Sequence, residues 1–494
     1  MTRAVRSAGV AAVLACVLAA CSADPAPPAP TDGATASPSA SADGTRQPTD
    51  DGAETDLVDG TSDPVEDSVY PRVGDPSVDA LHYDLDLTWD RHRQRLRGVE
   101  VLDFRATTTG DSFQLDFGAP LRVVDATLDG LPVETEHDGK DLVVHAAVEA
   151  DRTYTFALTY AGRPRPVRAP TTRSDFSTTG WTVTDSGSVW TMQEPYGAFT
   201  WYAVNDQPSD KALYDFTVHV DAPWVGITNG TLESREVVDG QTVTSFRLQE
   251  PASSYLITIA IGDYAVRHDE TSGGTPVTYW ALRSQRGAFA DLSYGTEAIE
   301  WIEQRLGPYP FSSAGIVLTE STSGMETQTL VTLGDSDYIR SRPVIVHELV
   351  HQWYGDLVTP TDWKDVWMNE GMTTYLQLVY ESEHGGTDLD EQMDQLWTYD
   401  ATFRGQAGPP AAYDPQEFGA QNVYYCPALM WHQLRLKVGD ETFWRLVQEW
   451  PRSEAFGNAD REEWTSWWEA QTGLDLGDFF DAWLLGSTTP DRGL

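Results

Sequence analysis

Two histidines and two glutamates in the second half of the chain have the residue types and the spacing of a zinc hydrolase site. His347 and His351 are four residues apart, so on an α-helix both imidazoles lie on one face and can reach the same cation. Glu348 follows the first histidine, where its carboxylate can act as general base on a water molecule at the metal. Catalytic zinc takes three protein ligands and leaves one position open, and Glu370 is the candidate for the third ligand.

The segment between these residues predicts the elements that position them. Eighteen residues separate His351 from Glu370. This length allows the first helix to end near Gly355, the chain to turn at Thr359-Pro360, and a second helix to return to the same metal. The sequence therefore predicts two neighbouring helices that hold one Zn²⁺ between them.

The rest of the second half is predicted to be mostly helical. Residues 291–306 have apolar positions at helical spacing and stop at Gly307-Pro308. A short strand is expected at 316–318, and a second apolar run ends at Leu333. Clear helical pieces follow the zinc helices at 429–438, 441–449 and 479–485. We assign residues 266–494 to this catalytic domain.

The preceding segment has the pattern of a β-rich domain, which we place at residues 69–265. Apolar and polar residues alternate from Leu81 to Trp89, and similar alternation returns at 99–104, 142–145, 153–158 and 216–220. Asp-Gly pairs at 129–130, 138–139 and 239–240 supply hairpin turns. The apolar run 255–261 is too short to cross a membrane and is predicted to be a buried strand.

Length and charge narrow the class of protein. A chain of 494 residues is expected to form two or three domains. It has 76 acidic against 33 basic residues, a formal net charge of −43. This acidic excess argues against electrostatic binding to nucleic acid or to an anionic membrane surface, and it favours solubility outside the cell.

The N-terminus predicts export from the cytoplasm. Arg3 and Arg6 precede an apolar segment, 8–20, that is too short for a stable membrane anchor, so residues 1–20 are predicted to be a signal peptide. It ends in Leu18-Ala19-Ala20-Cys21, which resembles the bacterial lipobox, in which the cysteine carries the lipid. We expect an extracytoplasmic protein anchored to the cell membrane through Cys21. A plain signal peptide and a secreted protein are the alternative.

Residues 21–68 are predicted to be a disordered tether. They consist mainly of Ala, Pro, Ser, Thr, Asp and Gly, with too few large apolar residues to form a core. Cys16 and Cys21 belong to the targeting segment, which leaves Cys426 without a partner, so we expect no intrachain disulfide in the mature chain.

Four separated elements of the sequence resemble the M1 family of zinc aminopeptidases in its short, two-domain bacterial form. The first is the zinc motif itself, residues 347–370. The second is similar to the family's Gly-x-Met-Glu-Asn strand and reads Ser323-Gly324-Met325-Glu326-Thr327. The third is similar to a family stretch that ends in Pro-Cys-x-Asp-x-Pro, and it runs from Glu194-Pro195-Tyr196 to Asp206-Gln207-Pro208. The fourth resembles Tyr-x-Lys/Arg-Gly-Ala followed by Leu-Arg, and it reads Tyr424-Tyr425-Cys426-Pro427-Ala428 with Leu434-Arg435.

The resemblance implies an α+β fold, with an N-terminal β-rich, saddle-like domain and a thermolysin-like, mainly α-helical catalytic domain that holds one Zn²⁺. It implies that His347, His351 and Glu370 are the ligands and that Glu348 is the general base of peptide hydrolysis by a zinc-bound water.

The resemblance also implies how the remaining site residues act. Tyr424 would donate a hydrogen bond to the oxyanion of the tetrahedral intermediate. Glu194 and Glu326 would bind the free α-ammonium of a peptide, with Gly324 and Met325 beside the substrate backbone. Asp206 is expected to serve the fold. We expect a monomeric enzyme that acts on peptides with a free N-terminus, binds no nucleic acid, and meets the membrane only through its lipid.

The sequence departs from the family pattern at several positions. Thr327 stands where members have Asn, and Cys426-Pro427 replaces the basic residue and the glycine. Because Pro427 disfavours helical geometry at the residue before it, we expect that helix to begin only at Ala428. The chain ends soon after the catalytic domain, so we expect the extra domains of longer members to be absent and the cleft to be open.

Two other functions compete with the aminopeptidase. A thermolysin-like endopeptidase would share the zinc helix but would not need Glu194 and Glu326. A catalytically impaired binding lipoprotein is suggested by Cys426-Pro427, although the complete ligand set and general base argue against it. The preferred N-terminal residue of the substrate is not predicted.

Overall fold

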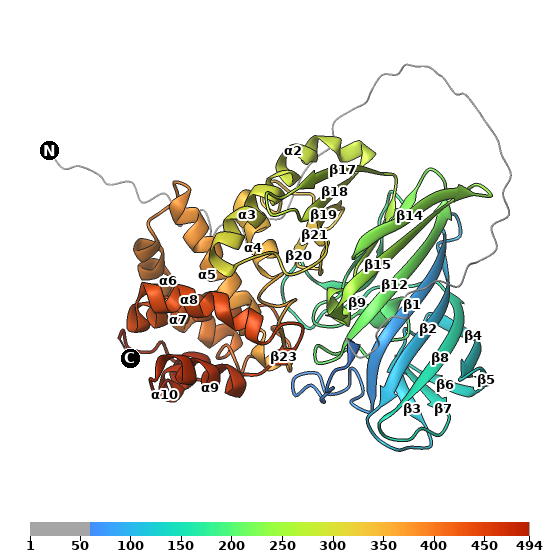
Figure 1. Ribbon diagram of the computed structural model, residues 1–494, viewed down its shortest axis with the longest axis horizontal. Coiled ribbons are helices and arrows are strands. Elements are labelled where there is room, and N and C mark those ends of the chain that lie inside the picture. The colour runs from blue at the N-terminus through green and yellow to red at the C-terminus, as the bar shows by residue number, and fades with distance from the viewer. Residues whose placement is uncertain (1–59, 494) are drawn as a thin grey trace, which may run out of the picture. The chain divides into compact units, whose positions relative to one another are not determined.

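An eight-stranded sheet dominates the N-terminal part of the protein (Figure 1). The computed structural model describes residues 60–493. The strand order is β14-β15-β12-β1-β2-β8-β4-β5, and β1 pairs in parallel with β12. The strands are β1 Val78–Asp90, β2 Arg95–Ala106, β4 Leu121–Leu128, β5 Leu131–Pro132, β8 Arg152–Gly162, β12 Lys211–Asp221, β14 Thr231–Val238 and β15 Gln241–Ser253.

Two smaller sheets complete this β-rich part, with orders β13-β16-β11-β10-β9 and β3-β7-β6. Alternate residues of β1, among them Tyr83, Leu85, Leu87 and Trp89, are buried in the core that these sheets share, as the alternation predicted. The strands are β3 Phe113–Asp116, β6 Glu134–Asp138, β7 Asp141–His145, β9 Val167–Arg168, β10 Thr178–Val183, β11 Val189–Met192, β13 Val225–Thr228 and β16 Ile259–Gly262.

The predicted Asp-Gly hairpin turns lie between β4 and β5 and between β14 and β15, whereas at 138–139 Asp138 is the last residue of β6 and only Gly139 of this pair lies in the turn to β7. Asp129 and Gly130 have φ of 48° and 75°, and Asp239 and Gly240 have 52° and 83°. Positive φ at both central residues is the backbone of a type I′ turn, whose twist matches that of paired strands.

The run 255–261 is not one strand, so this prediction was wrong. It contains a 3₁₀ turn, η3 Ser254–Leu256, and then β16. The side chain of Asn229 explains the interruption. Its amide donates to the Leu256 carbonyl (2.8 Å), and its carbonyl oxygen accepts from the Thr258 N–H (2.7 Å), so a side chain replaces the ladder hydrogen bonds there.

The C-terminal part combines a five-stranded sheet, β17-β18-β19-β21-β20, with helices (Figure 1). The strands are β17 Tyr264–Glu270, β18 Pro276–Leu282, β19 Ala314–Thr319, β20 Gly324–Met325 and β21 Val331–Gly334. The helices are α2 Phe289–Leu292, α3 Tyr294–Leu306, α4 Arg342–Val350, α5 Trp367–Glu383, α6 Leu389–Ala407, α7 Gln421–Val438, α8 Asp440–Ser453, α9 Arg461–Thr472 and α10 Gly477–Leu484. Short elements are η2 Ala198–Thr200, η4 Arg283–Ala288, η5 Trp363–Asp365, β22 Thr359–Pro360 and β23 Asn458–Ala459.

This arrangement confirms the predicted fold class, a β-rich domain followed by a mainly helical one. The proposed boundary at residues 265/266 falls inside β17, which belongs to the sheet of the helical part.

Two helix ends differ from the predictions. Helix α4 ends at Val350 rather than near Gly355, although His351 keeps right-handed helical angles as the residue after it. Helix α7 begins at Gln421, not at Ala428, and Pro427 lies inside it. A proline removes one hydrogen bond of the helix, but here its ring packs on α5, where a Cβ added to Gly371 would lie 2.6 Å from Pro427 Cβ. Tertiary packing therefore outweighs the local preference.

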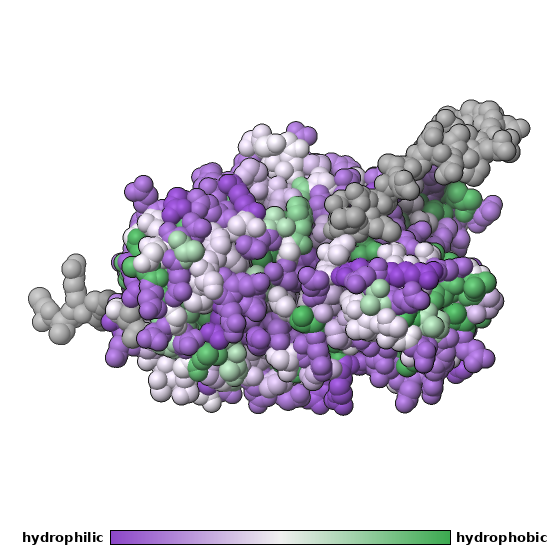
Figure 2. Space-filling view, turned by 60° about the horizontal axis from the view of Figure 1, so that its bottom comes forward, coloured by the Kyte–Doolittle hydropathy of each residue, from purple (hydrophilic) through white to green (hydrophobic). Residues whose placement is uncertain are grey.

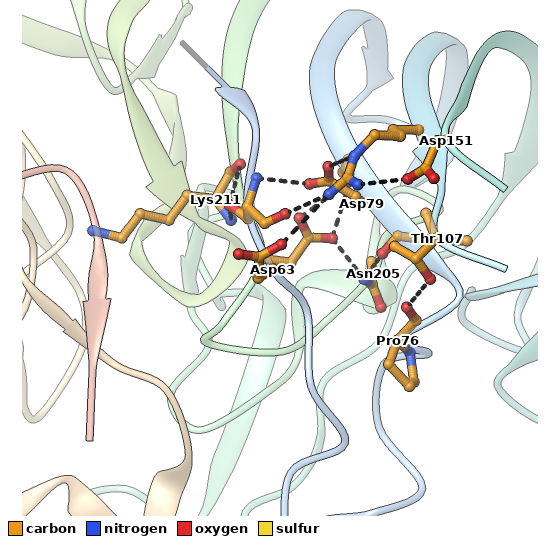
Figure 3. A network of polar contacts seen from close by, with 12 residues as sticks. Asp63, Pro76, Asp79, Thr107, Asp151, Asn205 and Lys211 are labelled. Atoms are coloured by element: carbon orange, nitrogen blue, oxygen red, sulfur yellow. Dashed lines mark hydrogen bonds and ion pairs between the residues drawn. The ribbon is translucent and has the colours of Figure 1, made fainter. Parts of the chain in front are cut away.

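The chain before β1 joins both parts of the molecule. Asp79 accepts hydrogen bonds from the Ser62 N–H (2.9 Å) and from Arg105 Nε (2.7 Å) (Figure 3). Further along, Asp67 accepts from the backbone N–H of Trp363 (2.7 Å) in the helical part. Residues 60–68, which we assigned to the tether, thus contact the folded protein. The rest of the predicted tether and signal peptide lies outside the described residues.

Lys211 makes a second connection. It lies at the start of β12, and its side chain extends away from the network around Asp79 (Figure 3). Its Nζ donates to the carbonyls of Asp356 (2.9 Å) and Leu357 (3.2 Å), just beyond α4. The two domains therefore share buried polar contacts near the predicted metal helix.

The surface is mainly hydrophilic on the face in Figure 2, with hydrophobic residues in separate groups. In the range 60–493, every helix is too short or too polar to pass through a bilayer. Cys426, the cysteine within this range, is free and buried.

Candidate active site

His347, His351 and Glu370 come together as a group that could hold a metal ion. His347 lies in α4, His351 directly follows it, and Glu370 lies in the first turn of α5. Glu370 Oε2 is 3.3 Å from His347 Nε2 and 3.5 Å from His351 Nε2. Two ligands about 2.0–2.1 Å from a tetrahedral centre lie about 3.3–3.4 Å apart, so the spacing fits a tetrahedral site.

Neighbouring groups orient both imidazoles toward this point. His347 Nδ1 is 3.1 Å from Gln377 Oε1, and His351 Nδ1 is 3.1 Å from the Tyr354 carbonyl. An oxygen acceptor at Nδ1 places the ring proton there and leaves the Nε2 lone pair free for a cation. Glu370 Oε2 is buried without a hydrogen-bond donor. This carboxylate oxygen is therefore available to bind a cation.

The charges in this group depend on one another. Burial opposes ionisation of Glu370, but the adjacent His351 and His347 lower its pKa. Burial also opposes the charge of His351, whereas the carboxylates of Glu326 and Glu370 raise its pKa well above the usual range. His351 and Glu370 thus stabilise each other as an ion pair, which a bound divalent cation would replace.

Glu348 is buried beside the ligands and directly against β20. A Cβ added to Gly324 would lie 2.2 Å from Glu348 Oε1, so only glycine leaves room for this carboxylate. Burial, and next the Glu326 carboxylate, raise the pKa of Glu348 well above its usual range. We expected Gly324 to give space to a substrate backbone. In the structure the missing side chain makes room for the predicted general base.

Glu194 and Glu326 lie on the other side of the group. One carboxylate oxygen from each of Glu194, Glu326 and Glu370 lies within 4.8 Å of the other two. Oε1 of both side chains is buried and without a hydrogen-bond donor. Burial raises the pKa of Glu194 well above its usual range, and Glu326 adds to the effect; burial likewise raises the pKa of Glu326. Two unpaired carboxylates so close together create a site for a small cation.

Met325 separates Gly324 from Glu326, and its side chain points into a different environment. It is buried in an apolar cluster with Tyr255, Trp363 and Val423. The backbone of β20 pairs with β21, with Met325 opposite Thr332.

The two adjacent tyrosines of α7 face different surroundings. The ring of Tyr424 stacks beside His347, with centroids 6.1 Å apart and an interplanar angle of 27°. The ring of Tyr425 instead stacks on Phe403 of α6, at 5.6 Å. Tyr424 is therefore the tyrosine that faces the ligand group, despite the unusual Cys426-Pro427 that follows.

Asp206 holds the loop that carries Glu194. Its carboxylate accepts hydrogen bonds from the Gly197 N–H (2.8 Å) and from Ser254 Oγ (2.7 Å). These contacts agree with the expected role in the fold.

Sequence reasoning did not identify two polar residues at the site. Gln377 could have been found, because it lies seven residues after Glu370 and so on the same face of α5. Arg173 gave no such signal. It lies in a loop of the β-rich domain, yet its Nη1 donates to Tyr424 Oη (3.0 Å) across 251 positions of sequence.

Comparison with known proteins identifies both domains. Residues 79–256 match the Peptidase M1 N-terminal domain, and residues 291–483 match the Peptidase family M1 domain. Aminopeptidase N of Streptomyces lividans is 27% identical over 450 residues, which cover 83% of this chain and 50% of that protein. Aminopeptidase M1 of Arabidopsis thaliana is 25% identical over 318 residues, which cover 59% of this chain and 36% of that protein. The chain thus spans half or less of the length of these relatives.

Solved structures show the same fold. The M1 zinc metallopeptidase from Deinococcus radiodurans, in a complex with a Tyr-Ser-Ala substrate, superposes with a TM-score of 0.78 at 24% identity. The match covers 87% of this chain and 100% of that one. The two domain matches agree with this likeness and together cover most of the sequence, so the chain belongs to the M1 family of peptidases.

Proposed function

We propose that the protein is a zinc-dependent aminopeptidase that removes the N-terminal residue of peptides outside the cytoplasm. The observation that carries this proposal is the pair of buried, unpaired carboxylates of Glu194 and Glu326 beside the group of His347, His351 and Glu370. A peptide with a free N-terminus has an α-ammonium group next to its first carbonyl. The two carboxylates would bind the ammonium group, and the metal group would bind the carbonyl. The relatives from Streptomyces and Arabidopsis are named aminopeptidases.

The residues present fit zinc in number, type and spacing, with two imidazole nitrogens and one carboxylate oxygen that lacks a donor. When bound by His347, His351 and Glu370, zinc supplies a Lewis acid that polarises the scissile carbonyl and acidifies water.

The protein's own groups would divide the remaining work. Glu194 and Glu326 bind the α-ammonium and so place the first peptide bond at the site. Glu348 takes the proton from the attacking water and delivers it to the leaving amine, a role that suits a buried carboxyl group whose pKa is raised above its usual range by burial and by the Glu326 carboxylate. Tyr424, beside His347, donates its phenol hydrogen to the developing oxyanion.

A comparison of free and acetylated substrates tests this function. The enzyme should hydrolyse aminoacyl reporter amides and short peptides, lose that activity with a chelator, and regain it with Zn²⁺. The N-acetylated peptide should resist cleavage, because acetylation removes the charge that the two carboxylates bind. Equal rates on both peptides, with internal cuts found by mass spectrometry, would instead indicate a thermolysin-like endopeptidase. Binding without any hydrolysis would indicate an impaired relative.

The cellular location is a separate part of the proposal. Cys21 and the signal peptide lie outside the described residues, so support comes from the sequence pattern alone. Lipid on Cys21 would hold the enzyme at the outer face of the cell membrane as a monomer. Cys21→Ala should move the protein from the membrane fraction to the soluble extracellular fraction. Unchanged fractionation would refute the anchor without affecting the enzymatic proposal.

A further inference from the structure

The loop between β9 and β10, residues 169–177, reaches from the β-rich domain into the active site. Arg173 lies near its centre and uses its guanidinium on three partners. Nη1 donates to Tyr424 Oη (3.0 Å) and to the Gly419 carbonyl (3.1 Å). Nε and Nη2 donate to the two carboxylate oxygens of Asp175, at 3.3 and 2.7 Å.

Hydrogen bonds hold this loop on both sides of the site. On the side of α7, the Phe418 N–H donates to the Pro170 carbonyl (3.0 Å). On the side of β20, Thr322 Oγ1 donates to the Asp175 carbonyl (3.1 Å) and Ser323 Oγ to the Asp175 carboxylate (3.4 Å). Arg173 and Asp175 thus form a bridge between the helix that carries Tyr424 and the residues just before β20, the strand that Glu326 directly follows.

This contact determines which way the phenol of Tyr424 can donate. A phenol oxygen has one hydrogen and can also accept, whereas a guanidinium has donors only. When Arg173 donates to Tyr424 Oη, the phenol hydrogen must point to another acceptor. The Tyr424 ring already stacks beside His347. The two hydrogen bonds to the Asp175 carboxylate hold the Arg173 guanidinium in one plane. A charged donor at the oxygen also polarises the O–H bond and strengthens it as a donor.

We infer that Arg173 is a positioning residue for Tyr424, held by Asp175, which directs the phenol hydrogen toward the oxyanion of the substrate. This inference rests on the proposed function, because it assumes that Tyr424 acts on a tetrahedral intermediate. It adds to that function a contribution of the β-rich domain to the chemical step. Arg173 and Asp175 lie outside the zinc motif, in a loop of the β-rich domain.

A double-mutant cycle tests the inference. Arg173→Met should lower kcat about tenfold with KM nearly unchanged, since a hydrogen bond from a charged group is lost in the transition state. In a Tyr424→Phe background the same substitution should change kcat less than about twofold, because no phenol is left to orient. Arg173→Lys, which keeps a charged donor, should recover part of the loss. Arg247→Met is the matched control, because this arginine also pairs with an aspartate, Asp215, but on the surface of the eight-stranded sheet, and it should behave as wild type.

Binding gives a readout that does not require turnover. A phosphinic dipeptide analogue presents a tetrahedral centre with an anionic oxygen, whereas the free amino acid product is planar at its carboxylate. Calorimetry should show about tenfold weaker binding of the analogue to Arg173→Met and unchanged binding of the product, with metal content normal in both proteins.

The outcomes separate the two proposals. Independent, multiplicative losses in the cycle, or equal affinity of wild type and Arg173→Met for the analogue, overturn the role of Arg173 while the aminopeptidase stands. A wild-type protein that neither hydrolyses peptides nor binds the analogue overturns both. If Arg173→Met does not fold, Arg173→Lys with and without Tyr424→Phe decides the question in the same way.

Discussion

At the scale of single residues, the site is marked by buried carboxylate oxygens that accept no hydrogen bond. Glu194, Glu326 and Glu370 each bury one such carboxylate oxygen. A buried carboxylate oxygen without a hydrogen-bond donor is costly, so these three atoms support the proposal that the site binds cations. The Glu370 oxygen faces the two histidines and suits a metal ion, whereas the oxygens of Glu194 and Glu326 suit an ammonium group.

The role of Glu348 can be separated from metal binding by substitution. Glu348→Gln keeps the size of the side chain and removes the base, so hydrolysis should fall roughly 10²–10⁴-fold while zinc content stays near that of wild type. His351→Ala removes a ligand instead and should lose the metal. Activity assays paired with metal analysis check both. Substantial turnover by Glu348→Gln would disprove its assignment as the general base.

The two tyrosines of α7 give a paired prediction. Tyr424→Phe should lower kcat roughly 10²-fold with little change in KM, the scale expected when one oxyanion donor is removed. Tyr425→Phe should be mild, because this ring stacks on Phe403 away from the ligands. Steady-state kinetics of both variants provide the test. A severe loss at Tyr425 alone would show that the wrong tyrosine has been assigned.

At the scale of elements, the site depends on close approach between a strand and one helix and between two further helices. Strand β20 has only two residues, and its Gly324 lies against the Glu348 carboxylate of α4. Helices α5 and α7 meet at another glycine, Gly371, which receives the ring of Pro427. Gly324 lies beside Glu348 in space, and Gly371 follows Glu370 in sequence, so the spacing of the backbones determines where these two carboxylates lie.

Gly324→Ala tests the spacing between β20 and α4. The new methyl group would overlap Glu348 Oε1, so the carboxylate must move, and a displacement of about 1 Å can lower the rate roughly 10²-fold. Zinc content and melting temperature should change little, because no ligand is removed. Gly405→Ala is the control, since that position in α6 has open space around it and should leave kcat unchanged. A fully active Gly324→Ala protein would contradict this account of the glycine.

At the scale of the whole molecule, buried polar groups join the two domains. Asp67 binds the backbone of the helical part from the segment before β1, and Lys211 does so from β12. Several buried aspartates of the molecule have raised pKa values. Burial is the main cause, and it raises the pKa of Asp67, Asp79 and Asp365 to about 6 and that of Asp116 to about 7.

These raised pKa values predict an unusual dependence of stability on pH. In the unfolded chain an aspartate titrates near pH 3.8, so between about pH 4 and about pH 7 the folded state binds more protons than the unfolded state. The free energy of unfolding should therefore increase as the pH falls through this window. Loss of repulsion within a chain of net charge −43 acts in the same direction.

Thermal unfolding of the metal-free protein, with chelator present throughout, measures this effect without the contribution of zinc. The melting temperature should be higher at about pH 5 than at about pH 7.5. Asp67→Asn keeps an oxygen that can accept the Trp363 N–H and removes the titration, so its melting temperature should depend less on pH. A melting temperature that falls steadily on acidification through the window would rule out this explanation.

The sequence alone determined the features that depend on local pattern. Histidines four residues apart share a face in any helix, alternation produces the long strands, and Asp-Gly pairs produce the turns between them. The α+β order of the domains and the group of His347, His351 and Glu370 could therefore be predicted from the sequence.

Only the tertiary structure decided what depends on contacts between distant segments. The interruption of 255–261 by the side chain of Asn229 could not be read from an apolar run. Pro427 lies inside α7 because packing against Gly371 outweighs the local preference of proline. Arg173 reaches Tyr424 from another domain, which no spacing in the sequence records. Local patterns specify which elements form, but the position of a side chain in the site follows from the packing of the whole chain, which brings together residues far apart in sequence.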